Sequence, residues 1–65
     1  MDPNATYHEM FCAMRDGDYV EAREMAINLK VWLGVGGFIP PTIHPTEFRA
    51  YIESVLRRTR GVALD

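Results

Sequence analysis

The side chains able to bind a metal ion are few and do not form a complete set. His8 and Cys12 lie four residues apart, a spacing that puts both on one face of a helix, where they could share a metal ion. Two ligands are too few, and Glu9 or His44 would have to complete the set, with no second cysteine or histidine pair nearby. We therefore expect no metal and no cofactor.

His8 and Cys12 also suggest a base and a nucleophile, if an acid lies close to them. A helical chain of 65 residues leaves little room for the pocket of several hundred cubic ångströms, on the order of 300 or more, that a substrate usually needs. The glycine-rich stretch 34–37 follows a predicted helix and runs into prolines, whereas phosphate-binding loops follow a strand and open a helix. The sequence therefore predicts no catalytic residue and no enzyme.

Arginines form the one marked cluster of charge. Arg57, Arg58 and Arg60 lie together, and Arg49 precedes them on the same predicted helix. Cations are favourable at the C-terminal end of a helix and usually face solvent there. The alternative is an anion-binding edge for nucleic acid, which the net charge of -2 and the absence of a helix-turn-helix glycine pattern oppose.

Length and composition indicate one small globular domain over residues 1–65. A chain of this size is near the lower limit for a self-sufficient core, and its single cysteine excludes an internal disulfide. Hydrophobic residues make up 48% of the chain and charged residues 25%, which is ordinary for a globular protein. The sequence has neither a secretory signal at its start nor a run of about 18 apolar residues. We therefore expect a cytoplasmic protein that does not bind membranes.

Hydrophobic periodicity predicts three helices, joined by one tight turn and one long loop. We expect the helices near residues 3–16, 19–33 and 45–59, with a loop rich in glycine and proline over residues 34–44. The tight turn makes the first two helices antiparallel neighbours, and the third then crosses one face of this hairpin. The sequence thus predicts an all-α fold, a small three-helix domain.

The helix ends carry residues that suit caps. Asp2 and Asp18 precede the first and second helices as N-caps, and Glu21 completes a capping box with Asp18. Gly17 and Gly34 follow the last turns of these helices, where a residue in the left-handed conformation often closes the end.

Each predicted helix has an apolar stripe that should face the core. In the loop, Phe38 and Ile39 are too apolar for a solvated linker, so we expect them to fold back over the end of the hairpin. The expected core positions are Tyr7, Met10, Phe11 and Met14, then Ala22, Met25, Ala26, Leu29, Trp32 and Leu33, then Phe48, Tyr51, Ile52, Val55 and Leu56.

The second helix has a further apolar stripe on its opposite side. Helical projection places Val20, Ile27 and Val31 together there, between polar flanks. A helix that is apolar on two sides is usually packed on two sides. Either the other helices cover both faces, or the second stripe contacts another chain.

Small size and a second stripe together favour a non-enzymatic protein-interaction module, either a homodimer or a domain that docks on a protein partner. The alternative is a nucleic-acid accessory protein that binds anions through its arginines. The partner-binding residues are expected to be Val20, Ile27, Val31 and Cys12, and the anion-binding residues of the alternative are Arg49, Arg57, Arg58 and Arg60.

The turn between the first two helices resembles part of a tetratricopeptide repeat. The run Gly17-Asp18-Tyr19-Val20-Glu21-Ala22, followed by Ala26 and Leu29, is similar to its turn and second helix. The first helix departs from the repeat pattern, and Gly34 stands where the repeat has proline, so the resemblance implies a helical hairpin and not a repeat protein. The longer pattern up to Pro40 is similar to short uncharacterised bacterial helical proteins, and this similarity implies no activity.

Overall fold

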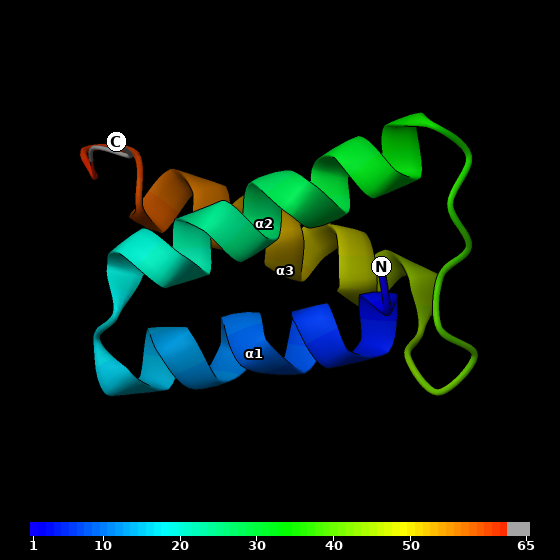
Figure 1. Ribbon diagram of the computed structural model, residues 1–65, viewed down its shortest axis with the longest axis horizontal. Helices are drawn as coiled ribbons and strands as arrows, with labels where there is room; N and C mark the ends of the chain where they lie inside the picture. The colour runs from blue at the N-terminus through cyan, green and yellow to red at the C-terminus, as the bar shows by residue number, and fades with distance from the viewer. Residues whose placement is uncertain (63–65) are drawn as a thin grey trace.

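The computed structural model describes residues 1–62 and shows three α-helices (Figure 1). Helix α1 spans Pro3–Asp16, α2 spans Tyr19–Gly34, and α3 spans Pro45–Arg58. Helices α1 and α2 form an antiparallel hairpin, and α3 lies behind them in this view, packed mainly on α2. The predicted all-α fold is confirmed, with each helix boundary within one residue of its predicted position.

The turn between α1 and α2 is closed by caps on both sides. Gly17 has a φ of 76°, a left-handed conformation that favours glycine. The backbone N–H of Asp18 donates to the carbonyl oxygen of Ala13 at 2.8 Å, and the Asp18 carboxylate accepts from the Glu21 N–H at 3.3 Å. In a full capping box the Glu21 side chain would also accept the Asp18 N–H. Because that N–H already donates to the Ala13 carbonyl, only the bond from the Glu21 N–H to the Asp18 carboxylate forms.

The end of α2 differs from the prediction in the residue that becomes left-handed. Gly34 is the last residue of the helix, and Gly36 has the positive φ, 86°. The Gly36 N–H donates to the backbone carbonyl oxygen of Leu33 at 3.2 Å, and the Gly37 N–H donates to that of Trp32 at 2.8 Å. Since α2 runs one residue further than predicted, the left-handed position moves from Gly34 to Gly36.

The loop after α2 packs on the core with only part of its apolar side chains. Ile39 is half-buried against the core, and Pro40 is buried. Phe38 is 62% exposed, and its ring lies edge-on to the half-buried Trp32 with centroids 5.6 Å apart. The indole N–H of Trp32 donates to the Phe38 carbonyl at 2.9 Å. The prediction that Phe38 folds back onto the core was therefore wrong. The hydrogen bond from Trp32 holds Phe38 beside the end of α2, and only the residues after Phe38 reach the core.

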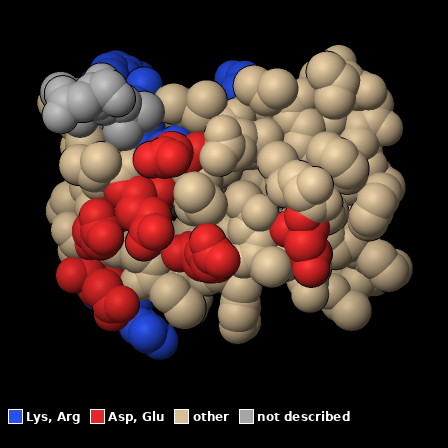
Figure 2. Space-filling model, in the orientation of Figure 1, with Lys and Arg blue, Asp and Glu red and all other residues tan. Residues whose placement is uncertain are grey.

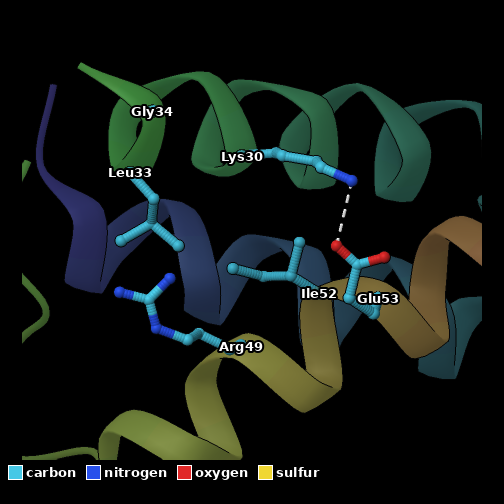
Figure 3. Close-up of a pocket in the computed structure, with 6 residues that line it drawn as sticks. All are labelled: Lys30, Leu33, Gly34, Arg49, Ile52 and Glu53. Carbon is cyan, nitrogen blue, oxygen red and sulfur yellow. Dashed lines mark ion pairs between the residues drawn. The ribbon is translucent and has the colours of Figure 1, made fainter. Parts of the chain in front are cut away.

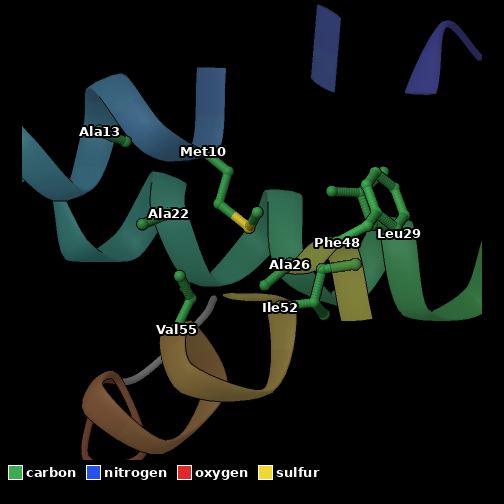
Figure 4. Close-up of a cluster of buried hydrophobic side chains, with 8 residues drawn as sticks. All are labelled: Met10, Ala13, Ala22, Ala26, Leu29, Phe48, Ile52 and Val55. Carbon is green, nitrogen blue, oxygen red and sulfur yellow. The ribbon is translucent and has the colours of Figure 1, made fainter. Parts of the chain in front are cut away.

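One hydrophobic core lies between the three helices (Figure 4). Helix α1 packs mainly on α2, so its buried stripe turns toward Ala13 and away from Phe11. Phe11 was predicted in the core and is 50% exposed. The buried hydrophobic residues are Met10, Ala13, Ala22, Ala26, Leu29, Phe48, Ile52 and Val55.

Arg23 of α2 ties the C-terminal end of α3 to the hairpin. One guanidinium nitrogen, Nη1, donates to the carbonyl oxygens of Leu56 and Thr59 at 3.2 and 3.4 Å, and to the Thr59 hydroxyl at 3.3 Å. Thr59 is fully buried. The last carbonyls of a helix lack intrahelical partners and carry partial negative charge. Arg23 therefore satisfies these groups and brings a cation to the negative end of α3.

Replacing Arg23 by methionine should lower the free energy of unfolding by about 1 to 3 kcal/mol, because the apolar stem stays while a charged donor to buried acceptors is lost. Urea unfolding followed by circular dichroism measures the change. Arg60→Met is the matched control, since Arg60 is exposed and its loss removes the same charge; it should cost less than about 0.5 kcal/mol. Equal losses in both variants would contradict the role given to Arg23.

The packing of Trp32 on the loop predicts opposite effects of alanine at two glycines. A Cβ at Gly37 would overlap the indole ring of Trp32, whereas one at Gly34 meets open space. Gly37→Ala should displace the indole and shift the fluorescence emission of this single tryptophan. It should also lower the free energy of unfolding by about 1 kcal/mol, because the hydrogen bond of the indole N–H is lost. Gly34→Ala should keep the emission and stabilise α2 by up to about 1 kcal/mol. Fluorescence-detected unfolding tests both, and unchanged emission in Gly37→Ala would disprove the contact.

Candidate functional site

The back of α2 is an apolar surface that the core leaves uncovered. Helix α2 contacts both α1 and α3, and the core that the three helices share lies on the side of Leu29. On the opposite side, Val20 and Val31 are 49% and 60% exposed, and Ile27 is half-buried. The other two helices therefore do not cover both faces of α2. The sequence pattern identified this stripe correctly as separate from the core.

The histidines and the cysteine are spread over two helices. Cys12 is a free, half-buried thiol on α1, and His8 on the same helix is exposed. His44 is the N-cap of α3, where its Nδ1 accepts the backbone N–H of Thr46 at 3.2 Å. Within residues 1–62 no three His, Cys, Asp or Glu side chains are grouped so that they could hold a metal ion.

The four arginines of the predicted anion-binding edge are exposed but divide between different surfaces. Arg49 lines a groove between α2 and α3, whereas Arg58 lines a second groove that α1 and the start of α2 form with α3. Arg57 and Arg60 are not among the residues that line either groove. The cluster seen in the sequence is thus split by the helical geometry of α3.

The groove between α2 and α3 has a volume of about 440 Å³ (Figure 3). Leu33 and Ile52 give it an apolar lining, and the Arg49 side chain extends along one end. The Nζ atom of Lys30 lies 3.0 Å from Oε1 of Glu53, so these two charges neutralise one another at the other end. The pair is exposed and adds little stability, but it leaves Arg49 as the one lining cation without an ion-pair partner among residues 1–62.

The second groove, which we call the aromatic groove, has a volume of about 580 Å³. Phe11 and Tyr19 line it and are half-exposed, at 50% and 48%, and the ring centroid of Phe11 lies 6.1 Å from that of Tyr51. Two guanidinium groups accompany these rings. The complete lining is Phe11, Met14, Arg15, Tyr19, Tyr51 and Arg58.

A chain of aromatic contacts fixes the inner wall of the aromatic groove. Tyr7 stacks on the buried Phe48 with centroids 5.0 Å apart and 19° between planes, and it meets Tyr51 edge-on at 5.6 Å. Burial raises the pKa of Tyr7, and the charges of Tyr51 and Glu47 raise it further. Burial also raises the pKa of Tyr51, although the nearby Arg58 acts in the opposite direction. In both cases burial favours the neutral phenol over the phenolate.

Sequence reasoning missed this groove because it assigned Phe11, Met14 and Tyr51 to the core. A usable signal was present, since Tyr51 and Arg58 are seven residues apart and so lie on the same face of α3. Which residues of α1 would meet that face depends on how the helices cross, and periodicity carries no such information.

Acidic side chains gather on the outer face of the hairpin, toward the turn between α1 and α2 (Figure 2). In the sequence, four exposed acids fall within nine residues around this turn: Asp16, Asp18, Glu21 and Glu24. The arginines, by contrast, are concentrated on and after α3. Along the chain, acidic residues therefore predominate around the turn of the hairpin, and arginines predominate on and after α3.

No protein-family model matches the chain, and neither the curated proteins nor the solved structures include one that matches it. The resemblance of the hairpin to a tetratricopeptide repeat stays a prediction. Within residues 1–62 no helix has both the length and the apolar character needed to cross a bilayer.

The raised tyrosine pKa values predict a loss of stability in alkali. The pKa values of Tyr7 and Tyr51 lie above the ordinary 10.0 in the folded chain, so the unfolded chain loses these protons first as the pH rises. The free energy of unfolding should therefore fall as the pH rises above about 10, until the folded pKa values are reached. Urea unfolding at a series of pH values measures this, and Tyr7→Phe and Tyr51→Phe should each reduce the slope. An unchanged slope in both variants would contradict the assignment.

Proposed function

We propose that this protein is a small non-enzymatic interaction module that forms a homodimer through the back of α2. The exposed pair Val20 and Val31, with Ile27 between them, supports this proposal because these side chains lie opposite the core. A domain this small buries little apolar surface, so covering the stripe in a dimer would add stability that the monomer lacks. The single unpaired thiol, Cys12, also suits the reducing cytoplasm.

The spacing on α2 favours antiparallel helices in this dimer. Val20, Glu24, Ile27 and Val31 follow one another at steps of four, three and four residues, which is the seam of a helix pair. In a parallel pair, Glu24 would face Glu24 of the partner subunit, and like charges would repel. In an antiparallel pair, Val20 lies opposite Val31 of the partner subunit, and Ile27 packs against the apolar stem of the partner's Glu24. A two-fold axis relates the two halves of such a contact.

Val31→Glu should raise the dimer dissociation constant about a hundredfold, because each dimer then buries two additional charges. Sedimentation equilibrium from micromolar to millimolar concentration measures the constant. Ala50→Glu is the matched control, since Ala50 is also an exposed apolar helix residue but lies on α3, and it should leave the constant almost unchanged. Glu24→Leu should strengthen the dimer by removing the one charge from the seam. A wild-type chain that stays monomeric at high micromolar concentration would refute the proposal.

Cross-linking tests the orientation separately. In a Cys12→Ser background, a chain with Val20→Cys mixed with a chain with Val31→Cys should oxidise mainly to the mixed disulfide, because those positions face one another in the antiparallel pair. Preferred disulfides between two copies of the same variant would show a parallel pair instead.

A further inference from the structure

We propose that the aromatic groove binds a nucleoside phosphate. The residues of the groove do not include Val20, Ile27 or Val31, so this proposal and the proposed dimer contact rest on different residues. Its volume of about 580 Å³ lies in the range of small-molecule sites. The lining combines the two groups that a nucleotide requires, flat rings for the base and guanidinium groups for the phosphate.

The rings form a platform for a base. Phe11 and Tyr19 leave about half of their surface open, which the packing of the domain does not require. Tyr51 is held in place by its edge contact with Tyr7, which in turn stacks on the buried Phe48. Because Tyr51 is held in this way, it loses little side-chain entropy on stacking against a base. Stacking accepts any base because every base has a flat face.

The cations supply the contact with the phosphate. Arg15 and Arg58 both line the groove, and no carboxylate is among the lining residues. A planar guanidinium group can donate two parallel hydrogen bonds to two oxygens of one phosphate. Arg15 also lies 3.4 Å from the Asp16 carboxylate, but both side chains are 64% exposed, and an ion pair in water is worth too little to compete with a phosphate.

The surroundings limit the length of the ligand. Asp16 and Asp18 are exposed next to Arg15 and Tyr19 in the chain, so a long polyanion that extends past the turn would be repelled. The groove between α2 and α3 is less suitable, because Glu53 already neutralises its Lys30 and no ring lines it. The ligand is therefore a single nucleoside phosphate, either free or as one unit of a single strand.

Fluorescence anisotropy of the full chain with labelled AMP and with a labelled single-stranded octanucleotide tests this site. Binding should weaken with salt, and Arg58→Gln should weaken it about tenfold to a hundredfold through loss of a charge-assisted contact. Arg57→Gln is the matched control, since it removes the same charge from the neighbouring position outside the groove, and it should change binding less than about twofold. Tyr19→Leu should weaken binding about tenfold by removing one stacking ring.

The two probes distinguish the two sources of the ligand. Binding of AMP shows a site for a free nucleotide, and binding of the octanucleotide without AMP shows a site for a single strand. Unlabelled adenosine, which has no phosphate, should compete far less well than AMP. Absence of binding by both probes at low salt would overturn the proposal, as would equal losses in Arg58→Gln and Arg57→Gln. Val31→Glu should bind like the wild type, so failure of the dimer would not affect this result.

Discussion

Small buried residues where α1 meets α2 govern how all three helices pack. Ala13 of α1 and Ala22 and Ala26 of α2 are all buried, and small side chains allow the helix backbones to come near each other. The hairpin therefore leaves only a narrow space for larger groups, which Met10 and Leu29 occupy. A core of this size is incomplete until α3 covers it, so the three helices depend on one another for stability.

Helix α3 lies across the hairpin because it cannot enter between helices packed so closely. It covers the core with Phe48, Ile52 and Val55, and Arg23 fixes its C-terminal end through the buried Thr59. A single helix lying on a pair leaves a groove along each of its flanks. Different residues of α3 line the groove on the α2 side and the aromatic groove on the α1 side, so the two grooves differ in chemistry.

The surfaces that remain after folding are separated by position. Acidic side chains collect on the hairpin near its turn, and most of the arginines lie on α3 or just after it. The apolar stripe of Val20, Ile27 and Val31 runs along the back of α2 and shares no residue with the lining of the aromatic groove. The two proposed contacts therefore rest on separate sets of residues.

Periodicity and caps such as Asp18 and Gly17 were enough to predict the helices, the tight turn and the second stripe of α2, because these features depend on residues close together in the chain. The sequence also identified most of the core, since the apolar stripe of an amphipathic helix normally faces the core. The folded structure was needed to show that Phe11 turns outward, that Arg23 caps another helix, and that Arg58 joins the aromatic groove. Each of these outcomes depends on where two helices cross, and that crossing is set by contacts between residues far apart in the chain.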